Sequence, residues 1–360
     1  MTSHWLSFGL ALVALGQSGS SALIQTAAVP QAAPQRVQPA PRPPQSPTYL
    51  ATQVDQLGSN FNGRVGIAVR SVDEGWSTSW NGNELSPQQS VSKLWVAITA
   101  LDAVDKGRVR LDDTVTLTRS DLTLFHQPIA AKILGGGTTV TLGELMYQAL
   151  TKSDNTCNDK LMRSVGGPEA VRAMIRAKGL GAIRFYEGER SLQSRIAGLT
   201  WSPSYSIGNA FYQARNALPM SVRKAAFNRY VEDPYDGASA NAIVNALAAL
   251  KRGELLSPAS TARLLRIMSQ TSTGKNRLRG GLKAGWTLSH KTGTGQVLGA
   301  TQAGYNDIGI LTAPDGRSYA VAVMIKKTST PLEVRMRLMN NVVRATITQH
   351  EMRYSPMVSL

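Results

Sequence analysis

Strand-like segments lie near both ends of the globular part of this chain, and a long helical block separates them. Residues 63–84 contain two β-like runs around the turn Asp73-Glu74-Gly75, which is a hairpin signal. Strand character returns only in residues 289–296, 303–313 and 317–327. Neither group of strands makes a stable sheet by itself. We therefore predict one antiparallel sheet to which both ends of the domain contribute.

The other periodic segments read as helices. An amphipathic pattern begins at Pro47, and a final helix is predicted at roughly 331–350. We expect these two terminal helices to cover the sheet. Residues from about 90 to 270 form a predicted helical lobe, interrupted by glycine and proline clusters. The predicted domain, 47–354, therefore places a sheet beside a helical lobe, with a crevice for a site between them.

The N-terminal residues predict export. Residues 1–22 resemble a signal peptide, with cleavage near Ala22 or Ala28, although an uncleaved anchor is the alternative. Residues 23–46 are rich in Pro, Ala and Gln and are predicted to be an extended linker. We expect a periplasmic or secreted protein. Its single cysteine, Cys157, excludes an internal disulfide and is expected to be a small core residue.

The net charge of +16 favours anionic partners, among them a cell-wall polymer. The basic residues are scattered, and no helix-turn-helix or RNP-like pattern accompanies them, so we do not expect nucleic-acid binding. With four widely spaced histidines and one cysteine, we expect neither a metal nor another cofactor.

A Ser-x-x-Lys pattern opens the most apolar helix of the chain. The pattern occurs three times, at Ser90/Lys93, Ser221/Lys224 and Ser272/Lys275. The last two lie in polar surroundings and are predicted to be solvated surface. The helix after Ser90 is apolar around most of its circumference and belongs in a core. A lysine there is costly unless it is partnered, and the free N–H groups at a helix N-terminus can bind an oxyanion.

Two further motifs follow in order. Ser153-Asp154-Asn155 lies at the start of a predicted helix, and Lys291-Thr292-Gly293 lies on a predicted strand. Gly293 is expected to allow a ligand to approach the backbone closely. Ser-x-x-Lys, Ser-Asp-Asn and Lys-Thr-Gly in this order are typical of active-site serine enzymes that react with penicillins.

With these motifs, residues of about 47–350 resemble the class A β-lactamases, which are akin to D-alanyl-D-alanine peptidases. The segments GELLSPAS, GLKAGWTLSHKTGTG and YNDIGIL carry the resemblance further. It implies an α+β fold in which a five-stranded antiparallel sheet, flanked by terminal helices, packs against an all-helical lobe.

The residues also suggest a mechanism. Ser90 is a weak nucleophile that needs a base, and Lys93 accepts its proton only when neutral. Desolvation and the nearby charge of Lys291 would favour that neutral form. Ser153 can relay a proton to the leaving nitrogen. Asn155 can hydrogen-bond the acyl side-chain amide. Three residues are expected to hold the substrate carboxylate: Lys291, Thr292 and Thr294. By resemblance, the N–H groups of Ser90 and Thr294 form the oxyanion hole.

Hydrolysis of the acyl-enzyme requires a further base, which the family places on a loop after Ser-Asp-Asn. Glu187 and Glu189 are the candidates, and alignment of Leu192-Gln193 with the family's Leu-Asn favours Glu189, with Gln193 helping to hold the water. The alternative is that Glu189 is a solvated loop acid without a catalytic role.

The chain departs from the family pattern around this glutamate. Arg190 replaces the usual proline, and an inserted helical segment precedes Asp236, which we expect to close the loop with Arg184 or Arg190.

Three further residues, His290, Phe125 and His126, have non-catalytic interpretations. His290 is expected to point outward from its strand. Phe125 and His126 either wall the cleft or pack within their loop.

Three functions remain open. The first is a monomeric serine β-lactamase that opens the β-lactam ring through an acyl-enzyme on Ser90. The second is a D-alanyl-D-alanine carboxypeptidase or a related cell-wall serine hydrolase. The third is a non-catalytic cell-wall-binding protein, which the intact set of motifs disfavours.

Overall fold

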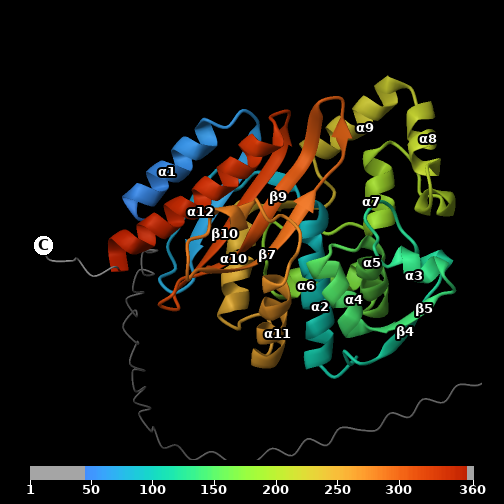
Figure 1. Cartoon of the computed structure of the whole chain (residues 1–360), viewed down its shortest axis with the longest axis horizontal. Helices are drawn as coiled ribbons and strands as arrows, with labels where there is room; N and C mark the ends of the chain where they lie inside the picture. The colour runs from blue at the N-terminus through green and yellow to red at the C-terminus, as the bar shows by residue number, and fades with distance from the viewer. Residues whose placement is uncertain (1–44, 355–360) are drawn as a thin grey trace, which may run out of the picture. The chain divides into compact units, whose positions relative to one another are not determined.

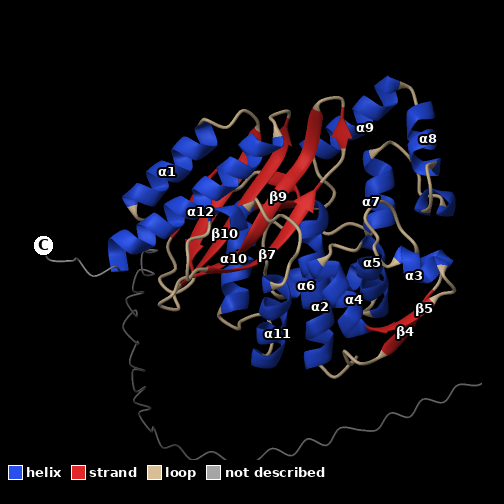
Figure 2. Ribbon diagram, viewed as in Figure 1, coloured by secondary structure: helices blue, strands red, loops and turns tan. Residues whose placement is uncertain are grey.

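A central antiparallel sheet joins the two ends of the domain, which confirms the predicted topology (Figures 1 and 2). The computed structural model describes residues 45–354; the predicted signal peptide and most of the predicted linker lie outside this range. The sheet order is β2-β1-β10-β9-β7. Its strands are β1 (Arg64–Ser71), β2 (Ser77–Trp80), β7 (Thr287–Thr294), β9 (Thr301–Thr312) and β10 (Ser318–Thr328). A two-residue strand that we did not predict, β8 (Val297–Leu298), pairs with β9.

Both faces of the sheet are buried, because side chains alternate along each strand. On one face, Val321 and Val323 of β10 share a core with α1 (Thr48–Ser59) and α12 (Leu332–Tyr354). On the other face, Ala322 and Met324 belong to the core of the helical lobe. The two terminal helices thus cover one side of the sheet, as predicted (Figure 1).

The helix α2 (Lys93–Asp105) lies in the middle of the helical lobe (Figure 1). Its residues from Lys93 to Leu101 are all buried, which agrees with its apolar circumference. The surrounding helices are α3 (Ala130–Leu134), α4 (Leu142–Thr151), α5 (Asn155–Ser164), α6 (Gly167–Ala177), α7 (Glu189–Ile196), α10 (Ala240–Lys251) and α11 (Pro258–Ser269).

The lobe is not purely helical. Two threonine-rich runs form the hairpin strands β4 (Thr114–Leu117) and β5 (Thr138–Thr141). Threonine and valine are β-branched and favour extended backbone, which explains why these runs are not helical. A second short pair, β3 (Leu85–Pro87) and β6 (Gly237–Ser239), lies next to the turn that carries Ser90. Short 3₁₀ turns occur at η1 (Gln89–Ser92), η2 (Arg119–Asp121), η3 (Pro203–Ser206) and η4 (Leu278–Gly281).

The segment between α7 and β6 is helical, as its sequence predicted. It contains η3 and two helices, α8 (Ala210–Ala217) and α9 (Met220–Glu232). Figure 1 shows α8 and α9 at the edge of the molecule, beyond α7. Within residues 45–354, no helix has the length and apolar character needed to cross a membrane.

Candidate active site

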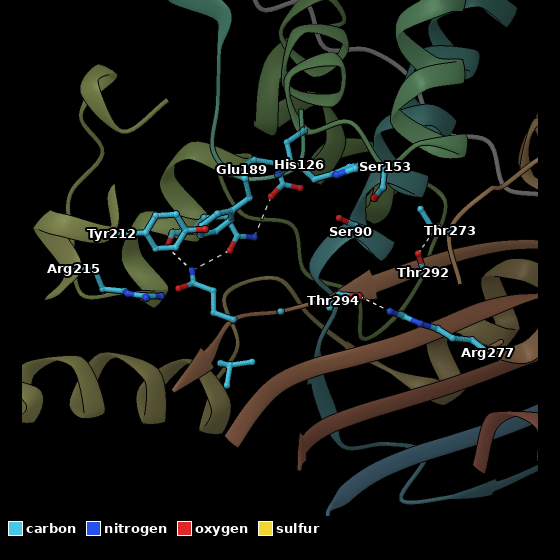
Figure 3. Close-up of a pocket in the computed structure, with 16 residues that line it drawn as sticks. Ser90, His126, Ser153, Glu189, Tyr212, Arg215, Thr273, Arg277, Thr292 and Thr294 are labelled. Carbon is cyan, nitrogen blue, oxygen red and sulfur yellow. Dashed lines mark hydrogen bonds between the residues drawn. The ribbon is translucent and has the colours of Figure 1, made fainter. Parts of the chain in front are cut away.

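Ser90 lines a cavity of about 610 Å³ (Figure 3), and the buried Lys93 contacts its hydroxyl. Ser90 lies in the turn η1, and Lys93 is the first residue of α2. The Lys93 ammonium donates a hydrogen bond to Ser90 Oγ over 2.8 Å, and only 1% of the Lys93 residue surface is exposed. The buried lysine is therefore partnered by the hydroxyl, which is the arrangement that the motif predicted.

The turn that carries Ser90 is held by the two glutamines before it. Gln88 Oε1 accepts a hydrogen bond from Trp95 Nε1 at 2.6 Å, and Gln88 Nε2 donates to the carbonyl of Asp236 at 2.6 Å. Gln89 has a φ of 54°, a conformation that is unfavourable for a residue with a side chain. Its N–H donates to Asp236 Oδ2 at 2.7 Å. These bonds compensate a strained backbone that presents Ser90 to the cavity.

Ser153 and Lys291 form the second half of the site. Lys291 Nζ donates to Ser153 Oγ at 2.9 Å and to the carbonyl of Thr292 at 2.9 Å. Ser153 has a φ of 61°, and the next residue, Asp154, caps α5 by accepting from the N–H of Cys157. The cap fixes the start of the helix and so the position of the serine just before it.

The two lysines lie close enough to affect each other. Burial lowers the pKa of Lys291 well below its ordinary value, and the positive charge of Lys93 lowers it further. Each amine contacts the hydroxyl of a serine that lines the cavity, Lys93 that of Ser90 and Lys291 that of Ser153, so both lysines meet the same cleft.

Glycine at position 293 is required by the protein's own packing. A Cβ at Gly293 would lie 2.2 Å from the carbonyl oxygen of Gln88. The close approach that we expected for a ligand is thus made by the backbone before Ser90. This contact sets the distance between β7 and the nucleophile turn.

Glu189 is buried, so the interpretation as a solvated loop acid is wrong. Only 3% of its surface is exposed, and its carboxylate forms an ion pair with Lys93. Gln193 Nε2 donates to the other carboxylate oxygen at 3.1 Å (Figure 3). Glu187, the other candidate, is exposed. The helix α7 begins at Glu189, whose backbone N–H donates a hydrogen bond to Asp159 Oδ1 over 3.0 Å.

The expected partners of Asp236 are wrong. Its carboxylate accepts hydrogen bonds from the N–H of Gln89 and, over 2.9 Å, from the hydroxyl of Tyr230. Arg184 instead pairs with Asp233, and Arg190 donates to the carbonyls of the loop 120–122. The long inserted segment supplies Tyr230, so the loop closes through neutral donors. Within residues 45–354 no basic side chain pairs with Asp236, and burial raises its pKa to about 7.

One end of the cavity is lined by hydroxyl groups and a guanidinium. Thr292 and Thr273 share a hydrogen bond of 2.7 Å, and Arg277 donates to Thr294 Oγ1 at 2.6 Å (Figure 3). Sequence reasoning missed Arg277, because it lies in a polar stretch with several other basic residues. Its motif signal is weak, and only the fold brings it next to β7.

Asn155 also lines the cavity, and its amide donates to the carbonyl of Leu124 at 2.8 Å. This bond positions the loop that carries Phe125 and His126, and both residues line the cleft. Of the two alternatives predicted for Phe125 and His126, the structure therefore supports a wall of the cleft. Cys157 is fully buried, as expected.

The expectation that His290 points outward is wrong. The residue is fully buried, and its Nδ1 lies 2.9 Å from Asp307 Oδ1. Because helices and loops cover both faces of the sheet near β7, alternation along this strand does not imply exposure.

Comparison with known proteins gives a consistent result. A sequence model of the β-lactamase enzyme family matches residues 49–350. The chain is 30% identical to the extended-spectrum β-lactamase PER-1 of Pseudomonas aeruginosa, over 79% of this chain and 82% of that protein. It is 28% identical to β-lactamase CTX-M-25 of Escherichia coli, over 76% and 80%. A crystal structure of a β-lactamase from Chitinophaga pinensis superposes with a TM-score of 0.69 at 30% identity, covering 83% of this chain and 98% of that one.

Proposed function

This chain belongs to the β-lactamase enzyme family, and from that premise we propose that it hydrolyses β-lactams through an acyl-enzyme on Ser90. One observation supports this proposal above the others. The buried Lys93 ammonium contacts both the Ser90 hydroxyl and the Glu189 carboxylate. A nucleophile, its base and a second acid–base group are thus connected through hydrogen bonds in one cavity.

Acylation begins with loss of the Ser90 proton. Transfer of a proton from Lys93 to Glu189 leaves a neutral amine, which then accepts the Ser90 proton as Oγ attacks the lactam carbonyl. The carbonyl oxygen becomes an oxyanion, for which we propose the N–H groups of Ser90 and Thr294 as donors. When the C–N bond of the ring breaks, Ser153 passes a proton to the leaving nitrogen. Lys291, 2.9 Å from Ser153 Oγ, is positioned to assist that transfer.

Deacylation requires an activated water. Before this step, the proton that Lys93 took from Ser90 replaces the one lost by Ser153, and Glu189 returns its proton to Lys93. We propose that Glu189, again a carboxylate, then removes a proton from the water while Gln193 helps to hold it. The water oxygen attacks the ester carbonyl, and Ser90 Oγ leaves with the returned proton. The contact between Gln193 and Glu189 supports this pairing.

The rest of the cavity suggests how the substrate is held. Lys291, Thr292 and Thr294 are proposed to bind its carboxylate, and Arg277 adds a positive charge at the same end. Gly293 keeps this strand close to the nucleophile turn, and Asn155 is proposed to donate to the acyl side-chain amide.

Intact-protein mass measured over time with benzylpenicillin tests the mechanism. The wild type is expected to show the free mass throughout while the penicillin is consumed. Glu189→Ala is expected to gain the mass of one penicillin and keep it, whereas Ser90→Ala stays unmodified. A wild type that accumulates a stable adduct would contradict the proposed hydrolysis.

A carboxypeptidase acting on cell-wall peptides is the second candidate. The inserted segment at the cleft and Arg190 in place of the family's proline favour it, because a reshaped cleft suits a larger substrate. Release of D-alanine from a pentapeptide would support this candidate. We further propose that the enzyme is exported, acts as a monomer on small molecules, and needs neither a cofactor nor nucleic acid.

A further inference from the structure

The inserted segment forms one wall of the candidate active site. Phe211 of α8 is buried against Leu124, and its ring meets Phe125 edge-to-face, with the centroids 5.0 Å apart. Gln127 Nε2 donates to the carbonyl of Ser206 at 2.7 Å. Aromatic packing and a backbone hydrogen bond therefore join the insertion to the loop that borders the cleft.

Arg190 joins the inserted segment to α7, the helix that begins at Glu189. Its guanidinium lies 5.4 Å from the centroid of the Trp201 ring and donates to the carbonyls of Ser120 and Leu122. The arginine that replaces the family's proline thus connects α7, the loop before Phe125 and the inserted segment. This bridge and the Phe211 contact fix the orientation of α8 toward the cavity.

Arg215 of α8 lines the same cavity as Ser90, and Figure 3 shows it extending from the inserted segment toward the cleft. Its guanidinium carbon lies 5.3 Å from the Tyr212 ring centroid. Its Nε is buried without a hydrogen-bond partner, and within residues 45–354 no carboxylate pairs with it. Burial and the nearby charge of Arg223 lower the pKa of Arg215. An arginine stays charged at neutral pH, so an anion entering the cavity would meet an unpaired cation.

This cation is distinct from the one at the carboxylate end of the site. In Figure 3, Tyr212 and Arg215 lie on one side of Ser90, and Arg277 lies on the other. Arg277 is already engaged by Thr294 and by two backbone carbonyls, at 3.0 and 2.7 Å. A substrate that fills the cavity would therefore meet positive charge at both ends.

We propose that Arg215 is a specificity-determining residue that binds a carboxylate on the acyl side chain of the substrate. The ring of Tyr212 supports the guanidinium, and Phe125, whose ring centroid lies 6.2 Å from that of Tyr212, lines the same cavity. The preferred substrates are then dianionic β-lactams, with one carboxylate on the fused ring and a second on the acyl group. This inference rests on the proposed function and names its substrate class.

Benzylpenicillin and its α-carboxylated derivative form a matched pair that differs only in the second carboxylate. kcat/KM is measured for both with the wild type, Arg215→Gln and Arg215→Lys. Lys224→Gln is the control, since Lys224 is an exposed cation of the same inserted segment that does not line the cavity. Arg215→Gln is expected to lower kcat/KM for the α-carboxylated substrate about tenfold, because a partly exposed charge-assisted hydrogen bond is lost.

Benzylpenicillin turnover is expected to change less than twofold in every variant, which also shows that the variants are folded. Arg215→Lys should retain most of the activity toward the dianionic substrate, and Lys224→Gln should match the wild type. Equal losses for both penicillins, or no loss for either, would overturn the inference while the proposed function stands. If the wild type consumes neither penicillin and Glu189→Ala gains no penicillin mass, the proposed function itself is refuted.

Discussion

Replacing Asp236 with asparagine is expected to remove most of the pH dependence that this carboxyl gives to stability. Burial raises its pKa from the ordinary value of 3.8 to about 7. The native state therefore holds a proton that the unfolded chain loses above about pH 4. Between these two pKa values the native state binds more protons, so the free energy of unfolding falls as pH rises. The loss begins near pH 4 and levels off above pH 7.

The size of this effect follows from the two pKa values. At about 1.4 kcal/mol per pH unit, the interval from 3.8 to about 7 corresponds to about 4 kcal/mol of stability present at pH 4 and absent above pH 7. Asparagine does not titrate, and its amide oxygen can still accept from the N–H of Gln89. The difference in stability between Asp236→Asn and the wild type should therefore grow with pH by about this amount, in favour of the variant.

Equilibrium unfolding in urea at intervals from pH 4 to pH 8 measures the difference directly. Asp159 serves as an internal control, because burial also raises its pKa, to about 6, and it is unchanged in both proteins. Its contribution cancels when the two curves are subtracted. A difference that stays constant with pH would mean that Asp236 is already ionised in the native state at pH 5. That result would refute the argument that burial outweighs the hydrogen bonds from Gln89 and Tyr230 and favours the protonated form.

Three other substitutions test separate parts of the structure. Gly293→Ala places a methyl group 2.2 Å from the carbonyl oxygen of Gln88, so kcat/KM for benzylpenicillin should fall at least about tenfold with a lower Tm; an unchanged kcat/KM would contradict the packing argument. Arg277→Ala removes a cation at the carboxylate end and should raise KM about tenfold with little change in kcat, which steady-state kinetics would show; a fall in kcat alone would argue against a binding role. Arg190→Ala should speed hydrogen exchange of the amides in residues 200–217 while α2 stays protected, and unchanged exchange there would argue against the bridge to Trp201.

The parts of the site predicted correctly from sequence are those that local spacing determines. Ser90 and Lys93 are three residues apart where the 3₁₀ turn η1 runs into α2, so their contact follows from one turn of helical backbone. The hairpin around Gly75 and the terminal helices likewise follow from short-range patterns. The order of the three motifs then indicated which distant residues meet, because each motif carries a recognisable function in one family.

The errors concern contacts between segments that are far apart in the chain. The partner of Asp236 was expected to be an arginine, since a carboxylate commonly pairs with a cation, but Tyr230 of the insertion occupies that position. His290 was expected outside, because alternation on a strand distinguishes two faces without saying what covers them. Gln88 and Gln89 carry no sequence signal, yet they hold the strained turn that presents Ser90.

The inserted segment connects these observations. Through Tyr230 it supplies a donor to Asp236, which in turn accepts from Gln89 beside the nucleophile. Through Arg215 it adds a cation to the side of the cavity opposite Arg277. One segment therefore supports the turn that carries Ser90, through Tyr230 and Asp236, and also lines the cavity in which the substrate is proposed to bind. A substitution that loosens the insertion should consequently affect both acylation of Ser90 and the choice of acyl side chain, whereas Arg215→Gln should affect the choice alone.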